Sequence, residues 1–510
     1  MSEVYSTLTA LFTDIADAIR ETTGDTDLIV ADDFPDLIRD SLQVKPYLTF
    51  KSPNSFTLKV NDTTKHWNGN LEYSTNASTW TTWDGTTTLS SATKGSSNVL
   101  YLRGTGNTVI TGDRYTYSWF LTGTDISCIG NIENLLDYAT VEAGNHPTMA
   151  DYCYNYMFYG CTSLTKAPAL PATTLTHYCY RGMFEGCKLL TQAPALPATT
   201  LAEGCYHGMF YSCTSITQAP ALPATTLAKN CYSSMFSGTS ITQSSALPAT
   251  TLAEGCYHGM FWDCKLLTKA PTLPVTTLAT NCYYNMFRNC TSLTQAPSLP
   301  ATTLANNCYR YMFSGCTALT QAPALPATTL AECCYYYMFE GCKLLTQAPA
   351  LPATTLANEC YSNMFNGCTT LTQPPALPAT TLANECYAYM FKGCTSLTQA
   401  PALPAATLST GCYYSMFSGC TALTQAPALP ATTLRGMCYY YMFNGCTGLK
   451  LSTTYTGEYT VAYRIPSSGT GTTAYSNALT DMFRNTGGTF TGTPEINTTY
   501  YLSNTNTVVS

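Results

Sequence analysis

Cysteine and histidine are the residues of this chain whose types and spacing could do chemistry. The sequence holds 25 cysteines and five histidines among 510 residues. Cysteines two to four residues apart with histidine partners would bind zinc, and paired cysteines in a secreted chain would form disulfides. Here the two cysteines of each unit are separated by seven residues, as Cys153 and Cys161 are. This spacing argues against a metal site.

A repeating unit positions these cysteines. The dipeptide Met-Phe recurs every 26 residues from Met157 to Met442, with one step of 25 between Met235 and Met260. The consensus reads C-Y-x-x-M-F-x-G-C-T-x-L-T-Q-A-P-A-L-P-A-T-T-L-A-x-x, and a decayed copy follows at Asp481. A unit of this length cannot bury its own apolar face, so it must stack on its neighbours. The period therefore predicts a solenoid.

The first half of each unit is expected to be a short helix. Cys153, Met157 and Cys161 fall at i, i+4 and i+8, and Gly160 sits where a left-handed helix cap belongs. The second half, "LTKAPALPATTLA", carries Pro168 and Pro171, which favour short extended segments over a continuous strand. The predicted core of the repeat is Cys153, Met157, Phe158, Cys161 and Leu164.

The helix expectation decides the state of the cysteines. Residues eight apart in a helix are separated by about 12 Å, whereas a disulfide tolerates Cα distances of only about 7 Å. The cysteine count is odd, the unit that begins at Cys231 lacks its second cysteine, and Cys333 is an extra one. We therefore expect reduced cysteines that act as small buried hydrophobic residues.

Composition excludes several classes of protein. Charged residues are 10% of the chain and the net charge is -7, so no footprint for nucleic acid is present. No stretch approaches the roughly 20 apolar residues that a membrane span needs. The first 21 residues lack the basic start of a signal peptide, which predicts synthesis in a cytoplasm without secretion by that route.

The repeat "MFxGCTSLTQAPALPATTLAxxCYxxMF" resembles the BspA-type leucine-rich repeats of bacterial surface proteins and phages. The resemblance implies a leucine-rich-repeat solenoid that acts as an adhesion surface, without catalytic residues or cofactors. "LFTDIADAIRETTGDTDLIVADDFPDLIRDSL" resembles the opening of gut-phage structural proteins, and the segments from "YLTFKSPNSFTLKV" to "VLYLRGTGNTVITG" resemble a small β-domain of such proteins. These matches imply a head or tail fibre that other virion proteins hold through the N-terminal region.

The expected fold class is a mixed α/β solenoid, a leucine-rich-repeat superhelix of about twelve 26-residue coils. Residues 1–45 form a helical attachment segment, with helices at 4–22 and 36–43. Residues 46–125 form a small all-β sandwich-like domain. Residues 126–450 are the solenoid with an N-terminal cap at 126–150, and residues 451–510 form a β-rich C-terminal cap.

Few other residues suggest chemistry. His207 and His258 share a repeat slot two units apart, about 10 Å if coils stack like strands, which is too far to share a metal ion. The repeated "LPATT" differs from a sortase signal because it is internal and ends in Thr. Trp67, Trp80 and Trp83 are either the core of the β-domain or a carbohydrate platform, and the core is favoured.

Comparison of the copies within the chain indicates a recognition surface. The Cys, Tyr, Met, Phe, Leu and Pro positions scarcely change, whereas the two residues between Tyr and Met and the residue after Phe vary freely. Aromatic residues are frequent at these free slots, as in binding surfaces, although neutral drift on a solvated face is an equal alternative. The candidate ligand-binding residues are Tyr156, Trp262, Tyr284, Tyr311, Tyr336, Tyr337, Tyr389, Tyr414, Tyr440 and Tyr441.

The leading hypothesis is a non-enzymatic phage virion protein, displayed outside the cell, whose repeats adhere to host-surface or mucus glycans or proteins. The alternatives are a bacterial cell-surface adhesin with the same repeats and a purely structural capsid decoration protein. Whether the chains form a homo-oligomer is left open.

Overall fold

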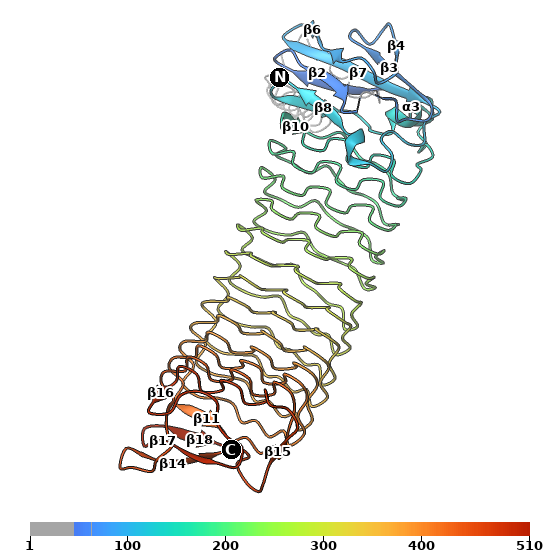
Figure 1. Cartoon of the computed structure of the whole chain (residues 1–510). Coiled ribbons are helices and arrows are strands. Elements are labelled where there is room, and N and C mark those ends of the chain that lie inside the picture. The colour runs from blue at the N-terminus through green and yellow to red at the C-terminus, as the bar shows by residue number, and fades with distance from the viewer. Residues whose placement is uncertain (1–44, 63) are drawn as a thin grey trace, which may run out of the picture. The chain divides into compact units, whose positions relative to one another are not determined.

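The computed structural model describes residues 45–62 and 64–510, which form two compact units (Figure 1). The described part of the first unit comprises residues 45–172 and 187–196, and the second comprises residues 173–186 and 197–510. The helices expected at 4–22 and 36–43 lie outside the described residues.

Two β-sheets build the first unit. The larger has the strand order β10-β9-β1-β7-β3-β4, with β6 also paired to β7, and the smaller has the order β5-β2-β8. The strands are β1 (Leu48–Ser52), β2 (Thr57–Val60), β3 (Asn70–Ser74), β4 (Thr81–Trp83), β5 (Leu89–Ser90), β6 (Ala92–Lys94), β7 (Ser97–Thr105), β8 (Trp119–Thr122), β9 (Ile126–Ile129) and β10 (Leu164–Lys166). A 3-10 helix, η2 (Tyr115–Tyr117), and an α-helix, α3 (Asn134–Glu142), complete the unit.

The tryptophans of this unit are mainly core residues. Trp67 and Trp83 are buried, with ring centroids 5.2 Å apart, and Trp83 contacts Trp119 at 5.6 Å. The alternative of a carbohydrate platform is therefore wrong for Trp67 and Trp83. Trp80 is half-buried, and the guanidinium of Arg103 lies 4.1 Å from its ring centroid.

The larger sheet continues past the boundary expected at residue 125. β9 pairs antiparallel with β1, and β10, which belongs to the first repeat, pairs parallel with β9. The N–H groups of Ile110, Trp119 and Ile126 donate to carbonyl groups of the first repeat at 2.7–2.9 Å. The β-domain itself therefore closes the open backbone of the first repeat, as the end of a solenoid requires.

The repeats contain no helix in the described residues, so the helix expected at Cys153, Met157 and Cys161 is wrong. In the first half of every repeat from Cys153 to Cys446, three left-handed residues with φ between about 50° and 78° follow one another at four-residue intervals. In the first repeat these residues are Tyr152, Tyr156 and Gly160. A left-handed residue interrupts an α-helix, so the segment winds as a series of single turns, which also have a period of four. The repeats are therefore built of stacked turns and short extended segments, and the expected mixed α/β class is wrong for them.

Backbone hydrogen bonds explain why these turns stack. In the repeat that begins at Cys205, the N–H groups of His207, Met209 and Tyr211 donate to carbonyls three residues earlier. The alternate N–H groups, of Tyr206 and Phe210 among others, donate to carbonyls of the following repeat at 2.8–3.0 Å. The backbone N–H groups of the segment thus find their partners alternately within the repeat and in the following repeat.

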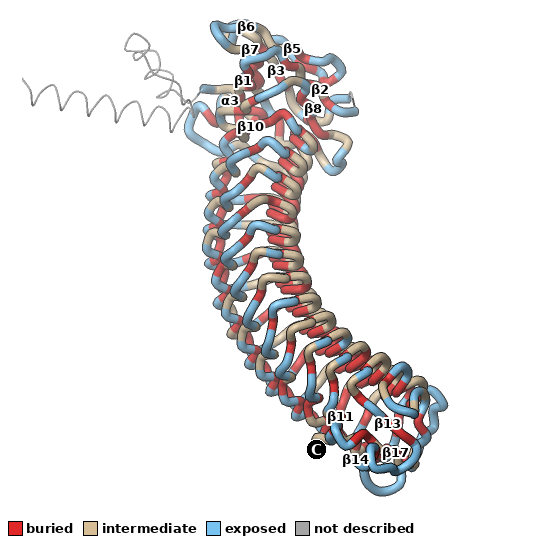
Figure 2. Tube along the Cα trace, turned by 90° about the vertical axis from the view of Figure 1, so that its left-hand side faces the viewer, coloured by how far each residue is buried: buried red, intermediate tan, exposed pale blue. Residues whose placement is uncertain are grey.

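Columns of identical side chains fill the interior of the second unit, where buried residues follow one another from repeat to repeat (Figure 2). Phenylalanine rings stack along Phe184, Phe210, Phe236 and onward with centroids 5.5–5.9 Å apart. The invariant tyrosines stack in the same way at 5.7–5.9 Å. Cys153, Met157, Phe158, Cys161 and Leu164 of the first unit are likewise buried.

All 25 cysteines are buried and free of disulfides in this structure. The second cysteine of a repeat donates its thiol to the phenylalanine carbonyl of the preceding repeat, with Sγ–O distances of 2.9–3.2 Å. In the 25-residue repeat, Thr239 takes the place of this cysteine and donates its hydroxyl to Phe236 of its own repeat. Threonine therefore occupies the position of the cysteine, and the repeat is one residue shorter in the turn that follows.

Short extended segments complete each repeat, as the prolines predict. Single parallel bridges join successive repeats at the glutamine or lysine position, for example Gln243 with Lys269, and at the threonine position, for example Thr226 with Thr251. The decayed copy continues the stack, since Phe483 lies 5.5 Å from Phe443. Strands of the last repeats and of the β-rich C-terminal segment then close the second unit. β11 (Gln425–Pro427) and β12 (Thr433–Leu434), in the repeat that begins at Cys412, pair with β18 (Thr507–Val509) and β15 (Thr472–Thr473) of the C-terminal segment. β13 (Lys450–Ser452), β14 (Tyr459–Arg464), β16 (Gly487–Gly488) and β17 (Thr499–Ser503) form a further sheet.

The buried thiols give a first prediction. We expect a thiol-specific colorimetric reagent to modify almost none of the cysteines in the native protein and all 25 after unfolding, because burial keeps the thiols protonated and inaccessible. Several thiols that react rapidly before any loss of the circular dichroism signal would contradict this interior.

Candidate recognition face

The half-buried slots of the turn segments form what we name the recognition face. In the repeat that begins at Cys334, the residues Cys334, Tyr335, Met338 and Phe339 are buried, whereas Tyr336, Tyr337 and Glu340 are half-buried. Because the turns stack in register, the corresponding slots of successive repeats lie beside one another. The face therefore consists of the two residues between Tyr and Met and the residue after Phe.

One group on this face, the Arg–Tyr cluster, comprises Trp262, Tyr284, Arg288, Arg310, Tyr311, Tyr336 and Tyr337. Tyr311 stacks on Tyr337 with centroids 4.8 Å apart and planes within 14°, and it meets Tyr336 edge-on at 5.8 Å. The guanidinium carbon of Arg310 lies 4.4 Å from the ring centroid of Tyr336. Arg288 lies 4.8 Å from Tyr311 and 6.0 Å from Trp262. These distances are typical of cation–π contacts.

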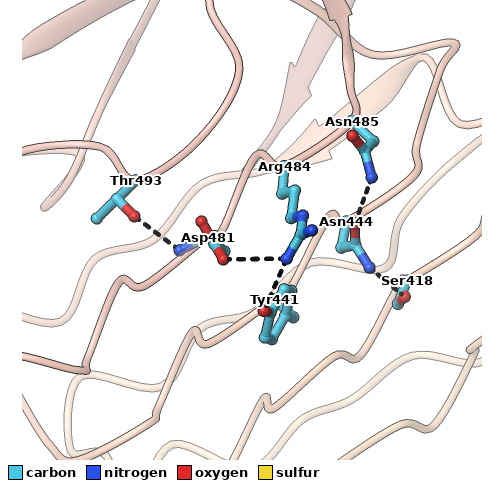
Figure 3. Close-up of polar contacts among 7 residues, drawn as sticks. All are labelled: Ser418, Tyr441, Asn444, Asp481, Arg484, Asn485 and Thr493. Carbon is cyan, nitrogen blue, oxygen red and sulfur yellow. Dashed lines mark hydrogen bonds and ion pairs between the residues drawn. The ribbon is translucent and has the colours of Figure 1, made fainter.

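A second group, the C-terminal tyrosine row, comprises Tyr389, Tyr414, Tyr440 and Tyr441. Tyr414 stacks on Tyr440 at 5.2 Å with nearly parallel planes, and Tyr389 lies 4.8 Å from Tyr414. Figure 3 shows its end, where Arg484 donates to the hydroxyl of Tyr441 at 3.1 Å and pairs with Asp481 at 3.5 Å. The two groups are separated by a repeat whose slots hold the small buried residues Ser362 and Asn363.

Nine of the ten residues predicted from the sequence thus lie on the face of the second unit. The tenth, Tyr156, lies in the first unit, 5.7 Å from Tyr159, which in turn lies 6.4 Å from Tyr115. Sequence reasoning did not include the arginines among the binding candidates, although Arg288 and Arg310 occupy the same free slots. It also missed Tyr115, which is 61% exposed and lies outside the repeats.

The tyrosines hold an unusual backbone conformation. The second residue between Tyr and Met has a left-handed φ in every repeat, and this position is tyrosine at Tyr156, Tyr311, Tyr337, Tyr389 and Tyr441, with φ of 54–56°. The other repeats have Gly, Asn or Ser there. A bulky side chain in this region costs roughly 1–2 kcal/mol relative to glycine.

The histidines of this face do not form a metal site. Ser233 lies between the slots of His207 and His258, and its hydroxyl is 3.3 Å from Nδ1 of His258. Among residues 45–62 and 64–510, no group of three His, Cys, Asp or Glu side chains could hold a metal ion. Burial, with a smaller contribution from Arg181, lowers the pKa of His207 to about 4.

The thiols are poor nucleophiles. Burial raises the pKa of Cys161 and Cys316 to about 12. Burial and the nearby carboxylate of Glu359 raise the pKa of Cys333, the additional cysteine, to about 11. A thiol with such a pKa is protonated at neutral pH and cannot act as a thiolate.

The chain thus stacks repeats of equal length, with an invariant interior and a variable face. These features are typical of solenoid repeat proteins, a class that often uses its extended surface for binding. The BspA type leucine rich repeat region matches the chain over residues 140–268, 206–346, 254–372 and 310–450. The chain therefore belongs to the BspA-type leucine-rich repeat family. No curated protein and no solved structure matches the chain. No helix in the described part of the chain is long and apolar enough to cross a bilayer.

Adjacent tyrosines of one repeat should respond differently to substitution. We expect Tyr337→Asn to change the free energy of unfolding by no more than about 1 kcal/mol, because relief of the left-handed strain offsets the lost ring contacts. Tyr335→Asn should destabilise by about 3–5 kcal/mol, because it removes a buried ring from the stack. Urea denaturation followed by circular dichroism measures both, and equal losses would contradict the division into face and core.

The lowered histidine pKa gives a pH prediction. His207 is neutral in the folded state at a pH where the unfolded chain, with a histidine pKa of about 6.5, already binds a proton. Protonation of this histidine in the unfolded chain therefore lowers the free energy of unfolding as the pH falls from about 6.5 towards 4, by at most about 1.4 kcal/mol per pH unit. Urea midpoints between pH 7.5 and 4 should fall less steeply for His207→Gln than for the unchanged protein. Identical slopes would contradict the assignment.

Proposed function

We propose that this protein is an adhesion protein whose recognition face binds glycans or proteins on a cell surface or in mucus. BspA-type repeats are in general not enzymes and suggest surface adhesion or protein interaction. The proposal is accordingly one of binding, without catalysis.

The observation that carries this proposal is the tyrosine at left-handed positions. Backbone preference alone favours glycine or asparagine there, and several repeats have these residues. Five repeats hold tyrosine in spite of the strain. Strained residues concentrate at functional sites, and tyrosine supplies a large, stiff contact surface with a polar tip. Neutral drift would not be expected to favour a bulky residue that this backbone conformation disfavours.

We further propose that the chain is displayed on a phage virion, as a head or tail fibre attached through its N-terminal region to other virion proteins. Support comes from the resemblance of residues 11–42 and of segments in the β-domain to phage structural proteins. A bacterial cell-surface adhesin and a capsid decoration protein are the alternatives. Mass spectrometry of purified phage particles tests this placement, and particles that lack the chain would overturn it.

Binding to a glycan array and to host cells tests the adhesion proposal. The full chain should bind at least one glycan or cell-surface protein, and the double variant Tyr311→Asn/Tyr337→Asn should bind at least tenfold more weakly, as expected for centrally placed aromatic contacts. The control is Tyr475→Asn, because Tyr475 is 46% exposed but lies outside the repeats' turn segments. No binding across a broad panel, or an equal loss in the control, would overturn the proposal.

A further inference from the structure

The two arginines of the Arg–Tyr cluster are held by aromatic rings. Arg310 lies over the rings of Tyr336, Tyr311 and Tyr284 at 4.4, 5.5 and 5.7 Å. Arg288 lies over Tyr311 at 4.8 Å. In the described part of the chain, neither arginine forms an ion pair with a carboxylate. Both guanidinium groups therefore keep their positive charge available at an aromatic surface.

The hydrogen-bonding capacity of these arginines is also incomplete. Nε of Arg288 and Nε of Arg310 are buried without a hydrogen-bond partner. Nη1 of Arg310 donates to the side-chain oxygen of Asn307 at 3.1 Å. Arg310 also hydrogen-bonds the side chain of Tyr311. Because each Nε is buried, a ligand would have to accept from the terminal Nη groups. A carboxylate suits this arrangement, since its two oxygens accept from a guanidinium in a planar, charge-assisted pair.

The neighbouring acids do not cancel this charge directly. Asp263 accepts a hydrogen bond from Asn289, and Glu340 accepts one from Ser314, each at 3.0 Å. Both acids are thus held by neutral hydrogen-bond partners. Glu359 also lies near the cluster, since its carboxylate accepts from the thiol of Cys333 at 3.8 Å and it acts on Tyr336, as Arg310 does. In the described part of the chain it forms no ion pair with either arginine.

The C-terminal tyrosine row differs in this respect. Its arginine, Arg484, is paired with Asp481. Its other cation, Lys392, lies 5.2 Å from the Tyr389 ring and offers a compact charge instead of a planar fork. The row is therefore aromatic without a free guanidinium, and it provides an internal comparison.

We propose that the Arg–Tyr cluster binds an acidic polysaccharide, with its carboxylates on Arg288 and Arg310 and its sugar rings on Tyr336 and Trp262. The inference rests on the proposed adhesion function and names its ligand class. The apolar face of a sugar ring stacks on the face of a tyrosine or tryptophan ring, and both residues are common in binding surfaces. A polymer that repeats also fits a face that repeats, because successive sugar units can engage successive repeats and gain avidity.

The test uses the full chain and surfaces coated with polygalacturonate, polysialate or hyaluronate, each compared with the same polymer after methyl esterification of its carboxyl groups. We expect at least tenfold stronger binding to one or more of the acidic forms than to its ester. Arg288→Gln and Arg310→Gln should each weaken that binding about tenfold or more, and Glu340→Gln should strengthen it. Lys343→Gln, which removes an exposed cation from the repeat of Tyr336 but outside the recognition face, should change it less than twofold.

Several results would overturn the proposal. Equal binding to acid and ester, or binding unaffected by the arginine variants, would show that the guanidinium groups do not recognise carboxylates. An equal loss with Lys343→Gln would refute specific recognition by the two arginines and indicate unspecific attraction of charge. Binding only to neutral glycans or to a protein, lost with Tyr311→Asn/Tyr337→Asn, would refute the acidic ligand and leave the adhesion function standing. No binding of any kind would refute both.

Discussion

In the turn segment of each repeat, the backbone N–H groups divide into two alternating sets, one that bonds within the repeat and one that bonds to the next repeat. This division is possible because every fourth residue is left-handed, which turns alternate peptide groups along the stacking direction. A continuous α-helix would use all its N–H groups internally and would leave nothing to join one repeat to another. The remaining features of the protein depend on this arrangement, from the stacked rings to the thiol hydrogen bonds and the exposed slots.

Much of this could be predicted from the sequence. The repeat period and the stacking follow from the regular Met-Phe spacing, and the interior could be identified from the positions that do not vary, such as Met157 and Phe158. The sequence also predicts reduced, buried cysteines, as the structure has them. The distance that excludes a disulfide within a repeat, however, is that of a helix, and the repeats contain turns instead. From Cys187 onward, the second cysteine of a repeat donates its thiol to the carbonyl of a phenylalanine in the preceding repeat, a contact that no spacing within one repeat reveals.

The error over the helix has a physical cause. Apolar residues at i, i+4 and i+8 mark one face of a helix, but they equally mark a series of turns with a period of four. The sequence does contain a distinguishing signal at the left-handed positions. Gly182 and Gly186 are four residues apart in one repeat, and Gly204 and Gly208 are four residues apart in the next. Glycine at such spacing disfavours a helix interior and favours a backbone that needs positive φ. The arginines of the face were missed for a different reason, because their role depends on rings contributed by neighbouring repeats.

Between repeats, the N–H groups of the turn segments donate to the following repeat and the thiols donate to the preceding repeat, so each repeat meets nearly identical partners before and after it. A copy inserted between two others, or removed, would consequently leave both junctions chemically unchanged. Duplication or loss of a unit through recombination between near-identical gene segments can then alter the number of ligand-contacting rows in a single event. The β-domain that closes the first repeat and the strands that close the last would be preserved, so valency can evolve separately from folding.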